Sequence, residues 1–332
     1  MNAASPPPLR SIRDLIRWGA SWFNRVGLSF GHGTDNALDE AYHLVLWQLK
    51  LPFDLPAAYL DSAVTDDERT AIFELLRRRV ETRQPAAYLT GEAWFAGLPF
   101  HIDRRALVPR SPLAEALHHR LQPPLTVVPR RILDLCSGCG CIGIAAAYAF
   151  EGAEVWLADV DPGAAELARR NVERHRLAER LQVVVGDLYA PLGRHRFDLI
   201  LANPPYVPTA EWTELAPEYR HEPRLGLDGG DDGLALVARI LDGAPAQLDE
   251  GGWLICEVGG SQPLFSARWP DIPVEWLSFE HGGDGVFAIE RESLAAWIEA
   301  GAPLRSDLDG AMLGMSHDIV SGSPRVAARP SR

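Results

Sequence analysis

Several features that would place this chain in a membrane or outside the cell are missing from its sequence. No run of about 18 apolar residues occurs, so we expect no membrane-spanning helix. The opening stretch, MNAASPPPLR, contains no apolar signal region. Four cysteines in 332 residues, three of them clustered, do not form the disulfide framework of a small secreted protein. These absences favour a reducing, cytoplasmic location.

Positive charge is also scarce, and it is unevenly spread. The net charge is −13 at pH 7. Residues 1–131 carry 16 Lys and Arg against 14 Asp and Glu, whereas residues 132–332 carry 16 against 31. Because tight sequence-independent binding to duplex nucleic acid depends on neutralised phosphates, we expect no DNA partner of that kind and no sequence-specific DNA binding. The acidic half suits a basic protein partner, although surplus acid can also serve solubility alone.

The first part of the chain predicts a flexible leader (1–9) and a helical substrate-recognition domain (10–85). Apolar residues recur at helical spacing, and Thr65 with Glu68 forms a capping-box pattern before the last helix. That last helix carries a group of arginines. A solvated helix face is the favoured interpretation of this group, and contact with a negatively charged partner such as RNA is the alternative. The arginines are Arg77, Arg78, Arg79 and Arg83.

Residues 86–112 alternate apolar and polar positions around turn formers, which predicts a β-hairpin linker. From there the pattern changes to alternating strands and helices, which indicates an α/β catalytic domain over 113–302 with a mainly parallel sheet covered on both faces. We expect a final antiparallel pair of strands and a disordered tail over 303–332. The predicted strands are 132–135, 155–158, 181–185, 197–202, 253–258, 274–279 and 285–290.

The most informative stretch is the turn Asn203-Pro204-Pro205-Tyr206. It follows the apolar run 197–202, which predicts a buried strand, and open α/β folds bind ligands where such strands end. Two consecutive prolines remove two N–H donors and leave a stiff turn rich in acceptors. Such a turn can accept both hydrogens of a planar NH2 group while the aromatic ring packs on its flat face. A rigid turn with no further role is the alternative.

A glycine-containing turn joins a strand to a helix in DLCSGCGCIGIA (134–145). Gly138 and Gly140 permit tight turns and close backbone approach, and the start of the helix offers N–H groups to an anion. Asp159 follows Gly138 by 21 residues, at the end of the next predicted strand, where a carboxylate commonly accepts both hydroxyls of a ribose. Asp187 follows the third strand and is placed to meet an adenine amino group.

These groups favour S-adenosylmethionine over a nicotinamide cofactor. The glycines match G-x-G-x-x-G, but a nicotinamide enzyme has no need of the Asn-Pro-Pro-Tyr turn. S-adenosylmethionine carries adenine, ribose and a carboxylate without a pyrophosphate, and Asn203 would also lie against it. Asp161 competes for the ribose, although its position favours a helix cap. Cys136, Ser137 and Cys139 complete the predicted cofactor loop; the cysteine spacing is too short for a structural zinc site, so we expect no metal.

Taken together, DLCSGCGCIGIA and NPPY resemble a class I S-adenosylmethionine-dependent methyltransferase acting on a planar nitrogen. Four further segments narrow this to a family, the N5-glutamine methyltransferases of the third protein of the large ribosomal subunit. They are LSFGHGTDNALDEAYHLVLW (28–47), LVPRSPLAE (107–115), LAPEYRHEPRLGLDGGDDGL (215–234) and GGDGVF (282–287). The resemblance covers roughly residues 10–295, and the cysteines of the glycine loop stand where relatives often carry Gly, Thr, Ser or Ala.

This resemblance implies a Rossmann-like, seven-stranded sheet, S-adenosyl-L-methionine as methyl donor and S-adenosyl-L-homocysteine as product. It implies a basic ribosomal protein as substrate, free or within an assembling large subunit. Arg110 and Glu115 would lie close to the donor, without an assigned role. Asn203 and the Pro204 carbonyl would accept the two N–H bonds of the glutamine amide, with Tyr206 packed on the amide plane.

Three other functions stay open at this point. One is the glutamine methyltransferase of translation release factors. Another is an amino-methyltransferase of DNA adenine or RNA guanine, because those exocyclic amines are also planar. A cofactor-binding scaffold without turnover is the third. For Glu257, at a strand end near the predicted site, a structural and a catalytic role are equally open.

Overall fold

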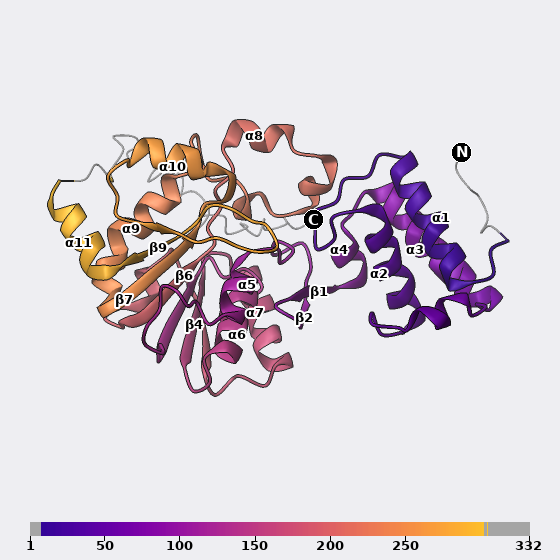
Figure 1. The fold of residues 1–332 in the computed structure, drawn as a ribbon, viewed down its shortest axis with the longest axis horizontal. Helices are drawn as coiled ribbons and strands as arrows, with labels where there is room; N and C mark the ends of the chain where they lie inside the picture. Colours follow the sequence, from indigo (N-terminus) through magenta and orange to yellow (C-terminus); the bar gives the residue numbers. More distant parts are fainter. Residues whose placement is uncertain (1–7, 302–303, 305–332) are drawn as a thin grey trace, which may run out of the picture.

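A computed structural model describes residues 8–301 and residue 304. Figure 1 shows two parts side by side, a group of N-terminal helices and a larger α/β part, with a small hairpin between them. The predicted leader (1–9) and tail (303–332) lie almost entirely outside the described residues. No helix within the described ranges is long and apolar enough to cross a membrane.

The N-terminal part consists of α1 (Ile12–Arg25), α2 (Ala37–Leu49), α3 (Asp66–Thr82) and the short α4 (Ala86–Thr90). Each of the three long helices begins where a side chain caps it, since Ser11, Asn36 and Thr65 accept from backbone N–H groups of their first turns. The predicted capping box of Thr65 with Glu68 is confirmed. Apolar faces of α1, α2 and α3 meet in a separate core.

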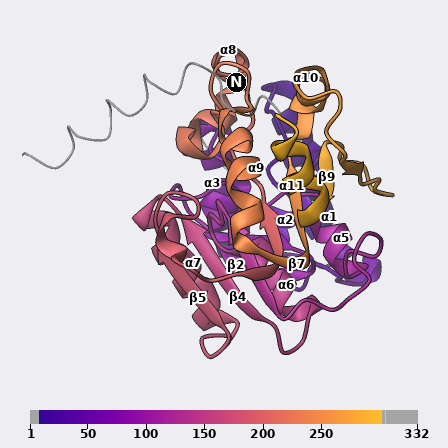
Figure 2. The ribbon, with the colours of Figure 1, turned by 90° about the vertical axis from the view of Figure 1, so that its left-hand side faces the viewer.

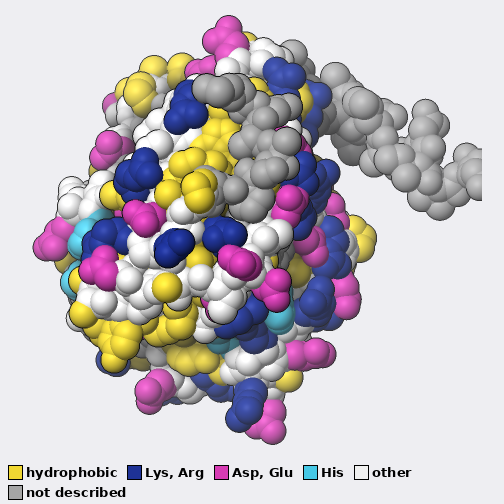
Figure 3. Space-filling view, turned by 90° about the vertical axis from the view of Figure 1, so that its right-hand side faces the viewer, with side chains coloured by type: hydrophobic (Ala, Val, Ile, Leu, Met, Phe, Trp, Pro, Cys, Tyr) yellow, Lys and Arg dark blue, Asp and Glu magenta, His cyan; other side chains and the backbone are white. Residues whose placement is uncertain are grey.

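The arginines of α3 do not form one solvated face. Arg78 is exposed and Arg77 partly so, but the side chain of Arg79 is fully buried against Glu40. The prediction is therefore wrong for Arg79, because α3 turns this position toward α2 rather than toward solvent. Over the N-terminal side of the molecule, basic and acidic side chains are interspersed rather than gathered by sign (Figure 3).

A two-stranded antiparallel hairpin, β1 (Glu92–Phe95) and β2 (Leu98–His101), lies within the predicted linker. Its two turn residues, Ala96 and Gly97, both have positive φ. The linker also contains α4 and an irregular stretch from 102 to 112, so only its centre is β-structure. The exact division of the chain into domains stays a prediction.

The predicted seven-stranded, mainly parallel sheet is confirmed, in the order β5-β4-β3-β6-β7-β9-β8. The first five strands in this order are parallel, and β9 and β8 pair antiparallel at one edge, as expected. The strands are β3 (Arg131–Leu135), β4 (Glu154–Asp159), β5 (Leu181–Val185), β6 (Phe197–Ala202), β7 (Leu248–Glu257), β8 (Glu275–Trp276) and β9 (Val286–Glu290). The sheet differs from prediction in a longer β7 and a much shorter β8.

Helices cover both faces of the sheet, and each face has its own apolar core. One core includes α5 (Leu113–His118), α6 (Cys141–Ala149) and α7 (Pro162–Arg174). The other includes α9 (Ala235–Gln247), α10 (Gln262–Arg268) and α11 (Arg291–Glu299). Figure 2 shows the strands between these two groups of helices. Between β6 and α9, the chain forms α8 (Thr209–Glu214) and a 3-10 turn (Pro217–His221), which packs near the N-terminal helices.

Candidate active site

The Asn203–Tyr206 turn begins directly after β6, whose neighbours in the sheet are β3 and β7. Pro204 is buried, while Asn203 is half-buried. Among the described residues, none hydrogen-bonds the Asn203 carboxamide. A polar side chain held at a sheet edge without a partner is free to bind a ligand. The turn therefore lies where its sequence predicts, directly after a buried strand, and its role in binding stays a prediction.

Two glycines let the chain pass closely beneath this turn. A Cβ at Gly229 would lie 2.7 Å from the Pro205 carbonyl oxygen, and one at Gly233 would lie 2.2 Å from the Tyr206 carbonyl oxygen. The Val207 N–H donates to the Leu227 carbonyl at 2.9 Å. Any side chain at these glycines would clash with the backbone of the turn. The loop 227–233 therefore packs directly against the turn and fixes its position.

The Tyr206 side chain is tied to Glu257 at the end of β7. Its hydroxyl donates to Glu257 Oε1 at 2.8 Å, and the Ser111 hydroxyl donates to Glu257 Oε2 at 2.5 Å. Burial raises the pKa of both Tyr206 and Glu257. The Tyr206 carbonyl accepts from the Ser261 hydroxyl at 2.7 Å. Ring and backbone of Tyr206 are therefore both held by partners distant in sequence.

The predicted glycine loop runs from β3 to α6 in a conformation that needs left-handed residues. Cys136, Gly138 and Gly140 all have positive φ, at 57°, 54° and 82°. The Gly138 N–H donates to Asp159 Oδ2 at 2.7 Å, which closes the loop against the end of β4. The first turn of α6 presents N–H groups that have no helical partner, as a helix start does in general.

Two buried polar atoms near this loop have no hydrogen-bond partner in the described part of the chain: Asp134 Oδ1 and Ser137 Oγ. The other oxygen of Asp134 accepts from the Gly143 N–H at 2.8 Å, and burial raises the pKa of Asp134 to about 8. Unpartnered buried polar atoms beside an open helix start fit a polar ligand that supplies donors and a carboxylate. These residues therefore suit S-adenosylmethionine.

Asp159 is the last residue of β4, and Asp187 follows β5 at the same edge of the sheet. Asp159 accepts backbone N–H groups from Gly138 and Asp161, and burial raises its pKa. Asp161 caps α7, as its position suggests, because it accepts from the N–H groups of Gly163 and Ala164. Asp187 is exposed and forms an ion pair with Arg239 at 2.7 Å.

The three clustered cysteines are free thiols, with Cys139 and Cys141 buried. Within the described ranges, no three His, Cys, Asp or Glu side chains are arranged to hold a metal ion. Cys139 accepts a hydrogen bond on its carbonyl from the Asn171 side chain at 2.9 Å, which ties the loop to α7. The roles assigned to Cys136, Ser137 and Cys139 stay predictions.

Sequence patterns gave no sign of Glu222, which joins three distant segments. Arg110 grips its carboxylate with two hydrogen bonds of 2.7 and 2.8 Å, and the Val108 N–H adds a third at 2.9 Å. In the buried ring of His32, Nε2 lies 3.4 Å from the same carboxylate. Burial opposes ionisation of Glu222, but His32 and Arg110 outweigh it and bring the pKa of Glu222 down to about 2. Only the folded chain brings these partners together.

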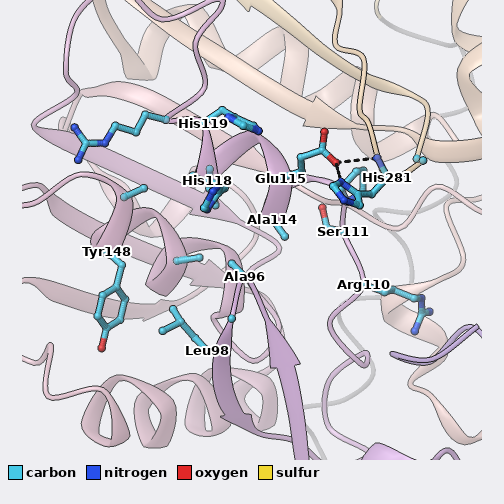
Figure 4. Close-up of a pocket in the computed structure, with 18 residues that line it drawn as sticks. Ala96, Leu98, Arg110, Ser111, Ala114, Glu115, His118, His119, Tyr148 and His281 are labelled. Carbon is cyan, nitrogen blue, oxygen red and sulfur yellow. Dashed lines mark hydrogen bonds and ion pairs between the residues drawn. The ribbon is translucent and has the colours of Figure 1, made fainter. Parts of the chain in front are cut away.

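Glu115 holds a glycine-rich loop in place. Its carboxylate accepts from the backbone N–H groups of Glu280 and His281, at 2.6 and 3.1 Å, and these bonds lower its pKa. Glu115 and His281 border a groove of about 1020 Å³ between the hairpin, α5 and α6. Ser111 stands near one end of the groove and Tyr148 near the other (Figure 4). The Asn203–Tyr206 turn does not line this groove.

The seven-stranded sheet, with a glycine loop after β3 and an Asn-Pro-Pro-Tyr turn after β6, defines a class I methyltransferase. Residues 113–217 match the family "Methyltransferase small domain". A methyltransferase structure from Pyrococcus furiosus is similar at 20% identity and a TM-score of 0.44, over 59% of this chain and 89% of that one.

Curated relatives resemble nearly the whole chain. The ribosomal protein uL3 glutamine methyltransferase of Bordetella pertussis is 46% identical over 86% of this chain and 97% of its own length. The protein of the same name from Xylella fastidiosa is 46% identical over 92% of this chain and 98% of its own length. The chain belongs to the family of ribosomal protein uL3 glutamine methyltransferases. It is an enzyme of the methyltransferase class.

Proposed function

We propose that this chain transfers a methyl group from S-adenosyl-L-methionine to the side-chain amide nitrogen of a glutamine in ribosomal protein uL3. The observation that carries the proposal is the half-buried Asn203 carboxamide, which has no partner among the described residues and follows the strand beside the glycine loop. The names of the relatives supply the substrate.

The cofactor would lie along the edge formed by β3, β4 and β5. Gly138 and Gly140 would allow close approach to the start of α6, where N–H groups bind the amino-acid carboxylate. Asp159 would accept the ribose hydroxyls with the lone pairs that its two backbone bonds leave free. Asp187 would meet the adenine amino group, and Cys136, Ser137 and Cys139 would line the loop around the amino-acid part.

The methyl donor supplies a methyl group on a positively charged sulfur, which is electrophilic without further activation. The difficulty lies in the amide nitrogen, because its lone pair is delocalised into the carbonyl. Asn203 Oδ1 and the Pro204 carbonyl would accept both N–H bonds and so orient the nitrogen. Their dipoles would also stabilise the positive charge that develops on it in the transition state. Pro205 keeps this turn stiff, and the Tyr206 ring would pack on the amide plane and exclude water.

A basic ribosomal protein suits the charge of this chain, since residues 132–332 carry nearly twice as many acidic as basic side chains. The substrate could meet the enzyme free or within an assembling large subunit, in the cytoplasm, and no sequence-specific DNA contact is part of the proposal. Opposite charges speed diffusional encounter more than they tighten the final complex. Raising the salt concentration should therefore increase the KM for the substrate and leave kcat nearly unchanged.

The proposal is tested with purified enzyme, labelled methyl donor and ribosomal proteins from cells that lack this enzyme. Mass spectrometry should locate one added methyl on a uL3 glutamine. Label on a release factor, on DNA adenine or on RNA guanine would instead support one of the alternatives. Binding of the donor without any transfer would support a scaffold.

The Asn203→Ala variant should turn over at least about a hundredfold more slowly, as expected when one preorganised hydrogen-bonding group is lost. The dissociation constant for the methyl donor, measured by calorimetry, should stay within a small factor of the wild-type value. Val207→Ala is the matched control, because Val207 pairs through its backbone and should keep near-normal activity. A near-normal rate for Asn203→Ala with intact donor binding would refute the role given to this residue.

A further inference from the structure

Glu257 is a buried carboxylate to which the sequence assigns no role. It is 4% exposed at the end of β7 and stands beside the catalytic turn. Its two oxygens meet two different hydroxyls, Tyr206 at 2.8 Å and Ser111 at 2.5 Å. These two residues lie 51 and 146 positions away in the sequence. One side chain thus ties the segment before α5 to the turn after β6.

The direction of the hydrogen bonds follows from counting donors. The Ser111 hydroxyl oxygen already accepts from the Leu113 N–H at 3.1 Å, so its single proton is available for Glu257. Tyr206 has one hydroxyl proton, and its oxygen lies within bonding distance of the other carboxylate oxygen. Both hydroxyls therefore donate, and Glu257 accepts on both oxygens, which is the pattern of an ionised carboxylate.

Packing restricts the Tyr206 ring from a second side. A Cβ at Gly259 would lie 2.5 Å from Tyr206 Cε2, so the bare backbone of Gly259 rests against the ring. The Gly259 backbone is itself held, because its N–H and that of Val258 both donate to the Gly285 carbonyl. Gly259 against the ring and Glu257 at the hydroxyl together restrict the orientation of the ring.

We propose that Glu257 is a positioning residue for the methyl transfer, acting by holding the Tyr206 ring in the orientation that packs on the substrate amide. This inference rests on the proposed function, in which Tyr206 contacts the glutamine carboxamide. Glu257 itself touches neither the amide nor the methyl group. Removing Glu257 should therefore lower kcat, and only because Tyr206 loses its position.

A double-mutant cycle in the full-length chain tests this route. Glu257→Ala should lower kcat by about tenfold to a hundredfold, the factor expected when a hydrogen bond to a charged group is lost. The dissociation constant for the methyl donor should not change. Glu257→Gln should lie between Glu257→Ala and the wild type, because an amide can still bond both hydroxyls in a changed direction. Glu250→Gln, an exposed position on the same strand, is the matched control.

The decisive comparison is Glu257→Ala in a Tyr206→Phe background. Since Phe has no hydroxyl for Glu257 to hold, the second substitution should add almost nothing to the loss. If the fold-losses in kcat of the two single variants instead multiply in the double variant, Glu257 acts by another route and the inference is overturned. Wild-type kcat in Glu257→Ala would overturn it as well. Should Glu257→Ala fail to fold, the same cycle with Glu257→Gln carries the comparison.

Failure of the proposed function would look different. If the wild-type enzyme methylates no glutamine, the proposed function is wrong, and crystal structures of the wild type and Glu257→Ala then decide the inference. A Tyr206 ring that turns away from its wild-type position supports the positioning role. A ring that stays in place in the variant refutes it.

Discussion

Replacing Arg79 by Met should destabilise the N-terminal helices far more than the same change at Arg77, two residues earlier on α3. The Arg79 side chain is fully buried and donates to Glu40 at 2.7 Å and to the Ser29 carbonyl at 3.1 Å. It also lies 3.9 Å from Glu218, another fully buried carboxylate. Methionine fills a similar volume without charge, so the change removes the ion pair and its hydrogen bonds while keeping most of the packing.

The magnitude follows from leaving a buried charge without its partner. Removing one member of a buried ion pair typically costs about 3–5 kcal/mol. Burial already raises the pKa of Glu40, and the Arg79 guanidinium is the main influence that opposes this rise. Without Arg79, the Glu40 carboxyl would take up a proton or draw in water, and either change weakens the packing of α2 on α3.

Urea unfolding followed by helical circular dichroism measures the effect, as the shift in midpoint at unchanged slope. Arg77→Met is the matched control, because Arg77 forms exposed pairs with Glu74 and Glu81 one turn away. Exposed pairs contribute little, so its midpoint should barely move. A double variant, Glu40→Met with Arg79→Met, should recover part of the loss. Equal midpoints for the Arg77 and Arg79 variants would refute the reasoning.

Two further predictions concern the glycine loop and the Glu222 cluster. In Gly143→Ala, the new Cβ would lie 2.1 Å from Leu157 Cδ2, so overpacking should lower stability by about 1–3 kcal/mol. Thermal unfolding measures this, with Gly260→Ala as control because a Cβ there meets nothing within 4 Å; equal melting temperatures would contradict the packing argument. His32 and Arg110 hold the pKa of Glu222 at about 2 in the folded protein, below the ordinary value of 4.5, so its ionisation stabilises the fold by about 3 kcal/mol above pH 5. That stability should fade as pH falls toward 2, and Glu222→Gln should lose this part of the acid dependence; identical pH profiles would exclude it.

Much of the architecture could be predicted because its signals are local. Strand and helix periods, the capping residues Asn36 and Thr65, and Pro162 after Asp161 lie within a few residues of the elements they define. The parallel direction of the first five strands follows from the alternation of strands and helices along the chain. The predicted site residues come at the ends of β3, β4, β5 and β6, which a parallel sheet brings to one edge.

Other features depend on partners far apart in the chain. The period of α3 did not show which of its arginines faces α2, and β8 is short because only two of its residues pair with β9. The partners of Glu222 come from residues 32, 108 and 110, and no spacing in the sequence links them. Such contacts depend on how helices and strands pack in the tertiary structure, and local sequence patterns do not encode this packing.

The sequence by itself determined the fold class, and it predicted a catalytic turn and a type of cofactor, because each depends on residues that are neighbours along the chain or that end adjacent strands. Only the tertiary structure decided that Tyr206 is held by Glu257, that Arg79 is buried and that Arg110 binds Glu222. The physical reason is that a buried charge or hydroxyl must find a partner wherever packing places one, and that place is set by the whole chain.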